Sequence, residues 1–212
     1  MKIIKKIYGA MPPYGWICAI LMTSWNFLIY FGSRVFTTGL YHHDIETDLD
    51  RALPFIPAFV IIYIFGSYAQ WIYGYYLVLR EDRVTAVRVA KAEIIAEIIC
   101  LVCFFVYPTT MGRPEVVGDD IFANLMRWLY DTDASDNLFP SVHCIESYMI
   151  MRTCFWAKTA PKWYRPATII MSILVFLSTF FCKQHVLADF VGAVICVEIG
   201  LFISRRVKWF EK

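Results

Sequence analysis

The chain has 212 residues, of which 59% are hydrophobic and 17% aromatic, and its mean hydropathy is +0.54. This composition excludes an ordinary soluble domain and indicates a polytopic membrane protein. The formal net charge is only +2 and the basic residues are spread over several loops, which excludes a nucleic-acid partner. The seven cysteines lie mostly in apolar runs, so we interpret them as small buried side chains rather than disulfides or zinc ligands.

Six apolar segments predict the fold. A hydrocarbon core of about 30 Å requires about 20 helical residues. The candidate spans are residues 14–32, 54–79, 92–107, 142–156, 167–181 and 185–204, of which the third, fourth and fifth are short. The chain contains neither an internal repeat nor a linker rich in glycine and serine. We therefore expect an all-α, six-transmembrane-helix bundle that forms a single domain over residues 1–212.

Lysine and arginine predict the orientation of this bundle, because cytoplasmic loops carry an excess of both. Fourteen of the 20 basic residues fall on one side: Lys2, Lys5, Lys6, Arg80, Arg83, Arg88, Lys91, Lys158, Lys162, Arg165, Arg205, Arg206, Lys208 and Lys212. The other side has Arg34, Arg51, Arg113, Arg127 and Lys183, and Arg152 lies within a span. We expect an integral protein of the cell membrane with both termini in the cytoplasm.

Two outer loops carry further signals. Residues 42–50 contain two histidines and four acidic side chains, which favours a solvated acidic loop, with a metal site as the alternative. In the third loop, apolar residues recur at helical spacing and predict a short amphipathic helix. These residues are Ile121, Phe122, Leu125, Trp128 and Leu129. The helix either lies on the outer membrane surface or packs over the bundle.

Three polar elements fall on the outer side of this topology, at the ends of spans three, four and six. They are Met111-Gly112-Arg113-Pro114, Phe139-Pro140-Ser141-Val142-His143, and Lys183-Gln184-His185 with Asp189. On a helix, His185 and Asp189 share one face, so the carboxylate can orient the imidazole ring. The alternative to a catalytic role is a structural one, in which this polar pair only helps to end one membrane span and to begin the next.

The residue types in these elements suit a phosphate. Arg113 and Lys183 supply positive charge, and the helix starts near Ser141 and His185 present free N–H groups. His185, oriented by Asp189, can attack phosphorus while His143 protonates the leaving oxygen and later activates water. No carboxylate cluster typical of a divalent ion accompanies these residues in the sequence, so we expect no metal and no cofactor.

The ordered Arg-Pro, Pro-Ser-x-His and His-x-x-x-Asp elements resemble the type 2 phosphatidic acid phosphatase superfamily, whose members are metal-independent lipid phosphatases and phosphotransferases. The resemblance extends from Arg113 to Asp189. It implies that Arg113 and Lys183 bind phosphate with support from Ser141, that His143 is the acid and base, that His185 is the nucleophile and that Asp189 orients it.

The chain also departs from the family pattern. Val106 stands where the family has lysine, Val142 where it has glycine, and Ser178-Thr179 where it has Ser-Arg. Lys183 would compensate for the missing charge. With these changes the chain resembles the branch of the family that includes the inositol phosphorylceramide synthases, which pass a phosphoryl group to an alcohol.

The sequence therefore predicts a membrane lipid phosphatase that acts through a phosphohistidine at the outer face, with a lipid phosphate and membrane lipids as partners. Candidate substrates are phosphatidic acid, phosphatidylglycerol phosphate and a polyprenyl diphosphate. One alternative is a phosphotransferase with an alcohol acceptor. Another is a non-enzymatic transporter or scaffold, favoured by Arg152, Glu146 and Glu97 inside spans, although these charges could simply pair within the bundle. The oligomeric state is left open.

Overall fold

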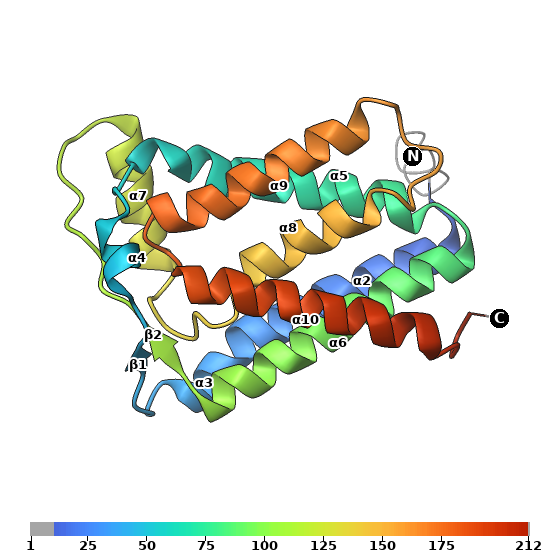
Figure 1. Cartoon of the computed structure of the whole chain (residues 1–212), viewed down its shortest axis with the longest axis horizontal. Coiled ribbons are helices and arrows are strands. Elements are labelled where there is room, and N and C mark those ends of the chain that lie inside the picture. Colours follow the sequence, from blue (N-terminus) through green and yellow to red (C-terminus); the bar gives the residue numbers. More distant parts are fainter. Residues whose placement is uncertain (1–10, 212) are drawn as a thin grey trace, which may run out of the picture.

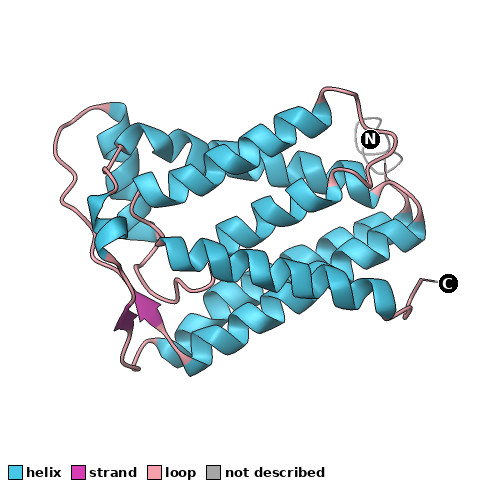
Figure 2. Cartoon of the chain, viewed as in Figure 1, coloured by secondary structure: helices cyan, strands magenta, loops and turns pink. Residues whose placement is uncertain are grey.

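The computed structural model describes residues 11–211, so Lys2, Lys5, Lys6 and Lys212 lie outside the described part. The described chain is helical except for one short parallel strand pair (Figure 1, Figure 2). In chain order the elements are α2 (Pro13–Phe27), η1 (Leu28–Gly32), α3 (Ser33–Thr37), β1 (His43–Asp44), α4 (Asp48–Ala52), η2 (Pro57–Phe59), η3 (Ile62–Gly66), α5 (Ser67–Leu79), α6 (Arg83–Val106), β2 (Thr109–Thr110), α7 (Ile121–Thr132), α8 (Val142–Thr153), α9 (Tyr164–Phe181) and α10 (Leu187–Arg206).

The long helices run side by side along the longest axis of the molecule (Figure 1). α10 packs against α6 and α8, while α2 packs against α6 and α5, and α9 against α8 and α5. The principal apolar core lies between α6, α8 and α10 and includes Ala96, Cys100, Ile145 and Val197. The buried cysteines thus serve as small core side chains, and all seven are free thiols.

Three helices are long and apolar enough to cross a membrane: Pro13–Thr37, Tyr164–Phe181 and Leu187–Arg206. The other three expected spans do not reach that standard. The second runs through η3 and α5, where Ser67, Gln70 and several tyrosines lower the mean hydropathy. The fourth is the 12-residue α8, and α6 is long but carries several charged residues. Length and composition therefore establish three candidate spans, not six.

Helix bounds differ from the expected ones where a local cap decides them. α6 begins at Arg83 instead of residue 92, because the Asp82 carboxylate accepts a hydrogen bond from the Thr85 N–H at 3.0 Å and caps the helix. α10 begins at Leu187 instead of 185, and α8 ends at Thr153 instead of 156.

The expected amphipathic helix is present as α7 and packs over one end of the bundle. Asp120 caps it by accepting the N–H groups of Phe122 and Ala123. Its buried Met126 and Leu129 join a cluster with Tyr63 and Val60, whereas Trp128 on the opposite face is exposed. α4 and the β1–β2 pair gather at this same end (Figure 1).

The expectation of a solvated acidic loop is wrong for part of residues 42–50. Thr47 and Asp50 form a capping box that starts α4, and Asp50 is only 3% exposed while Asp48 faces solvent. The Asp50 carboxylate accepts the N–H of Leu187 at 2.8 Å. This contact fastens the loop to the first turn of α10.

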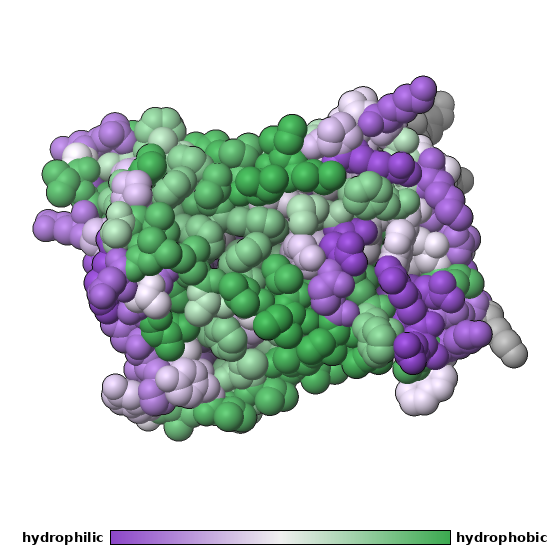
Figure 3. Space-filling view, viewed as in Figure 1, coloured by the Kyte–Doolittle hydropathy of each residue, from purple (hydrophilic) through white to green (hydrophobic). Residues whose placement is uncertain are grey.

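The surface separates into polar ends and an apolar middle. In Figure 3 hydrophobic side chains gather over the central part of the visible face, and hydrophilic ones lie mainly toward its two ends. Elsewhere in the described chain, large hydrophobic side chains such as Ile17, Phe31, Ile72 and Ile195 are also exposed. Exposed apolar surface of this extent is typical of a protein in contact with lipid.

Both described ends of the chain lie beside the turn between α5 and α6. The Tyr14 hydroxyl donates to the Glu81 carbonyl oxygen, and Glu211 accepts hydrogen bonds from Arg88 and Lys91. The start of α2 and the end of α10 therefore share one end of the bundle, opposite α4 and α7 (Figure 1).

Candidate functional site

The turn between α9 and α10 shapes the first part of the site. α9 ends where Lys183 adopts a left-handed backbone conformation with φ of 49°, and the Thr179 carbonyl then accepts the N–H groups of Gln184 and His185. Asp189, in the first turn of α10, receives hydrogen bonds on one oxygen from the Val186 N–H and from His185 Nδ1, both at 3.0 Å. The structure thus contains the expected hydrogen bond between Asp189 and His185, and the orienting role stays a prediction.

His143 stands in the first turn of α8, which Ser141 caps by accepting the Cys144 N–H at 3.3 Å. Its ring stacks on Tyr63 at 4.2 Å between centroids, and its Nδ1 lies 3.3 Å from the Tyr63 hydroxyl. The Ser141 N–H also donates to the Asp189 carbonyl oxygen. These contacts hold the start of α8 against the start of α10.

The two imidazole rings lie close together, with 6.3 Å between the centroids of His143 and His185. Each ring is held through Nδ1, which leaves both Nε2 atoms for other partners.

Arg113 lies beside this pair. Its guanidinium lies over the Tyr130 ring, 4.5 Å from the centroid, and donates to the carbonyl oxygens of Asp133 and Tyr130 and to the Gln184 side-chain oxygen at 2.6 Å. Its buried Nε–H has no acceptor among residues 11–211. A buried orphan donor of this kind suits an anion.

Lys183 is 8% exposed, and its ammonium donates to the Asp50 backbone oxygen at 2.6 Å. An ammonium group has three donors, so this contact leaves two. Burial of the Asp50 carboxyl by itself raises its pKa, but hydrogen bonds from Thr47 and from the Leu187 N–H, together with the Lys183 charge, lower the pKa below its usual value.

All six expected site residues thus lie at one end of the bundle. His143, His185, Asp189 and Ser141 are joined by direct contacts. Arg113 reaches them through Gln184, and Lys183 adjoins them in the chain while its side chain points to Asp50. The geometry brings both basic residues to the end of the bundle that carries the histidines, without establishing a role for either.

Several residues that shape the site were missed in the sequence. Tyr63 lies in an apolar segment and Tyr130 in an amphipathic one. Such sequence patterns do not show that Tyr63 stacks on His143 or that Tyr130 lies under the Arg113 guanidinium. Asp50 had a usable signal, since Thr47-x-x-Asp50 has the spacing of a capping box. Asp133 accepts from Tyr30 and from Arg34 at 2.9 Å, a contact between distant segments.

A cavity of about 910 Å³ leads away from the site between α2, α5 and α8. His143 and Asp133 line it near the site, and Met11 and Leu79 line it toward the other end of the bundle. Most of its remaining wall is aromatic or aliphatic, including Phe27, Tyr63, Trp71, Ile72 and Trp128. It is large enough for a lipid chain, and its walls are suitably apolar.

Arg152 pairs with a different partner from the one expected. Its guanidinium binds the Glu198 carboxylate of α10, with Nε to Oε1 at 2.5 Å and the second nitrogen to Oε2 at 3.2 Å. The interpretation that Arg152 pairs with Glu146 and Glu97 is therefore wrong. Those two carboxylates are bridged by the Asn26 amide instead, at 2.6 and 2.9 Å.

Comparison of the chain with family models, curated proteins and solved structures gave no match. The resemblance to the type 2 phosphatidic acid phosphatases thus stands on the three short sequence elements alone.

Proposed function

We propose that the chain is an integral membrane lipid phosphatase that hydrolyses a lipid phosphomonoester or diphosphate through a phosphohistidine. The observation that carries this proposal is the arrangement of two imidazole rings 6.3 Å apart, one of them held by a carboxylate, at one end of an apolar cavity. A nucleophile with a positioned carboxylate and a second proton carrier is the minimum set for a covalent transfer.

In the first step Nε2 of His185 attacks phosphorus and the bond from phosphorus to the lipid oxygen breaks. His143, protonated on both ring nitrogens, gives its Nε2 proton to that oxygen and becomes neutral, while its Nδ1–H donates to the Tyr63 hydroxyl oxygen, which holds the ring. In the second step water attacks phosphorus, the N–P bond breaks, and His143 takes the proton of the water. Asp189 accepts from His185 Nδ1 throughout and stabilises the charged ring.

The phosphate would be held by Arg113 and Lys183, with the N-terminal end of α8 at Ser141 contributing its dipole. The unpartnered Nε–H of Arg113 supports this assignment, as do the two unused donors of Lys183. Positive charge around the transferring group favours the loose transition state of phosphoryl transfer. This mechanism needs no metal ion for the chemistry.

The lipid tail would lie in the cavity lined by Phe27, Trp71 and Ile72, with its phosphate at His143. We further propose that all six long helices cross the membrane, that both termini are cytoplasmic, and that the site is on the outer face. The basic residues near the α5–α6 turn, such as Arg80, Arg83 and Arg88, support this orientation.

The test is phosphate release by the purified full chain in detergent, across phosphatidic acid, phosphatidylglycerol phosphate and a polyprenyl diphosphate. At least one of them should release phosphate, and His185→Ala should slow that release by at least about 1,000-fold because the nucleophile is lost. His42→Ala, a histidine at the same end but outside the site, should retain the rate.

A chelator should leave the initial rate of folded protein unchanged, with folding followed by a thermal melt in the same detergent. A rate that disappears with the chelator while the protein stays folded, and returns with a divalent ion, would contradict the proposed chemistry. Release from none of the lipids would favour a non-enzymatic membrane protein.

The departures from the family pattern favour a second candidate, a phosphotransferase with an alcohol acceptor. These departures are Val106, Val142 and Ser178-Thr179. Supplying inositol or diacylglycerol with the lipid phosphate distinguishes the two, because a transferase forms a phosphorylated alcohol at the expense of free phosphate.

A further inference from the structure

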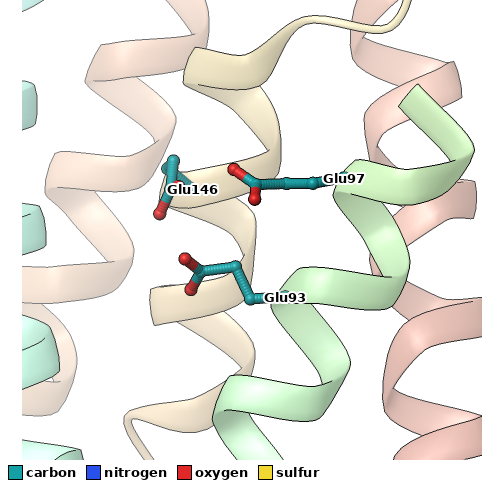
Figure 4. A group of neighbouring side chains, drawn as sticks. All are labelled: Glu93, Glu97 and Glu146. Atoms are coloured by element: carbon teal, nitrogen blue, oxygen red, sulfur yellow. The ribbon is translucent and has the colours of Figure 1, made fainter. Parts of the chain in front are cut away.

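Three buried carboxylates converge in the interior of the bundle, at a place that the proposed phosphoryl transfer does not use. Glu93 and Glu97 come from α6 and Glu146 from α8, and their side chains are directed into the space between the two helices (Figure 4). One oxygen of each lies within 4.8 Å of one oxygen of both others. Their exposed fractions are 1%, 0% and 4%.

These carboxylates have no cationic partner. Within residues 11–211, no lysine, arginine or histidine forms an ion pair with any of them, and the nearby Arg152 is occupied by Glu198. Buried charges are costly unless they are paired or bind a metal ion. Something other than a described side chain must therefore neutralise the cluster.

Neutral donors satisfy only part of the cluster. The Asn26 amide donates to Glu97 Oε1 and Glu146 Oε1, and the Tyr75 hydroxyl donates to Glu146 Oε2 at 2.5 Å. The Oε2 atoms of Glu93 and Glu97 are buried and have no hydrogen-bond partner in the described chain. Protons shared between neighbouring carboxyl groups or a bound cation can neutralise this charge, but only a cation can be coordinated by all three carboxylates at once.

We propose that Glu93, Glu97 and Glu146 bind one divalent cation of the class that prefers oxygen ligands, namely Ca²⁺, Mg²⁺ or Mn²⁺. Two oxygens bound to one Ca²⁺ at about 2.3–2.6 Å are separated by at most about 5 Å, so the observed spacing accommodates the ion without rearrangement. The cavity supplies access, because Glu93, Glu146, Asn26 and Tyr75 all line it.

The cation would join α6 to α8 and stabilise the core beneath the site. Glu146 follows His143 by three residues on α8, so the same helix carries the ion ligand and the proposed proton carrier. The role is structural and separate from phosphoryl transfer. The cation site therefore does not depend on the proposed enzymatic function.

The test is cation binding to the purified full chain, after extensive treatment with chelator, with Ca²⁺, Mg²⁺ and Mn²⁺ supplied separately. At least one of them should bind with a stoichiometry near one and raise the melting temperature, and Mn²⁺ binding can also be followed by electron paramagnetic resonance. Glu97→Gln keeps an acceptor for Asn26 but removes a charged ligand, and should weaken binding by at least about 10-fold.

Glu198→Gln is the matched control, since it removes a carboxylate from another helix at the Arg152 pair and should leave cation binding unchanged. If wild-type protein binds none of the three ions and its melting temperature does not respond to them, the cluster is held by protons and the proposal is wrong. Equal binding by Glu97→Gln and wild type would also overturn it. Both readouts are independent of phosphate release.

Discussion

One carboxylate oxygen of Asp189 accepts two hydrogen bonds that have different roles. That oxygen accepts the Val186 N–H, which starts α10, and His185 Nδ1, which holds the proposed nucleophile. The residue is fully buried, and its other oxygen has no partner among the described residues. A structural and a functional contribution therefore meet at one position, and a suitable substitution can separate them.

Asp189→Asn should separate these contributions. The amide oxygen can still accept from the Val186 N–H and from His185, so the fold is kept, but a neutral amide lacks the negative charge that stabilises the charged His185 ring. We expect turnover to fall by about 10²- to 10⁴-fold with little change in melting temperature. Steady-state phosphate release and a thermal melt in the same detergent check this, and near-normal turnover would remove the orienting role.

At the scale of secondary-structure elements, the five-residue helix α4 helps to hold the turn that carries His185. It is linked to α10 through the Asp50 carboxylate and the Leu187 N–H, and to the turn before α10 through the Asp50 carbonyl oxygen and Lys183. A loop on the surface thereby supports the turn that carries His185. Because the pKa of Asp50 is lowered in the fold, its stabilising contribution depends on pH in a definite direction.

Asp50→Asn should destabilise the protein at neutral pH by about 1.5–3 kcal/mol, because a charged acceptor for Thr47 and Leu187 is replaced by a neutral one. A lowered folded pKa contributes stability above the unfolded pKa of about 3.9, and the contribution is lost as the pH falls through the folded value. The difference in melting temperature between variant and wild type should therefore shrink in acid. Asp48→Asn, at an exposed neighbour, should show no such difference.

The contact between α6 and α10 depends on a glycine. A methyl group at Gly200 would collide with the backbone oxygen of Ala92, so the two helices can approach this closely only because position 200 has no side chain. Backbone atoms on a neighbouring helix cannot rotate away as a flexible side chain can. The close packing of α6 against α10 therefore requires a glycine at position 200.

Gly200→Ala should destabilise the protein by about 1–3 kcal/mol through overpacking. The measurement is a thermal or denaturant melt of the purified protein. Gly39→Ala is a suitable control because a methyl group there meets no atom within 4 Å. A Gly200→Ala melt that coincides with the control would show that α6 and α10 separate more easily than the packing indicates.

The whole molecule is polarised along its long axis. The site end carries acidic side chains such as Asp44, Asp48 and Asp119, while the end with the α5–α6 turn carries Arg83 and Lys91. Between them lies the apolar belt of Figure 3. The lysines and arginines at the end with the α5–α6 turn support the proposed orientation, in which that end faces the cytoplasm.

Cysteine labelling in intact cells tests this orientation. With a thiol reagent that does not cross membranes, Glu115→Cys, which is exposed near the site end, should react directly. Lys162→Cys, exposed in the loop between α8 and α9, should react only after the membrane is permeabilised. The wild-type chain measures the background from the seven native cysteines. The reverse pattern would place the site in the cytoplasm.

The sequence by itself was sufficient for features that depend on residues close in the chain. The four-residue spacing of His185 and Asp189, the apolar periodicity of α7 and the hydropathy of the first and last two long helices all act within one or two helical turns, so local pattern predicts them. The same reasoning placed Ser141 at a helix start, because the cap is also a local interaction.

Only the tertiary structure decided which helix faces meet. The partner of Arg152, the burial of Asp50, the stacking of His143 on Tyr63 and the convergence of Glu93 with Glu146 all join segments that are far apart in the chain. A helix of low amphipathicity, such as α6 or α10, presents apolar side chains all round and does not show which of its faces packs inward. Packing selects that face through the shape of all its neighbours together.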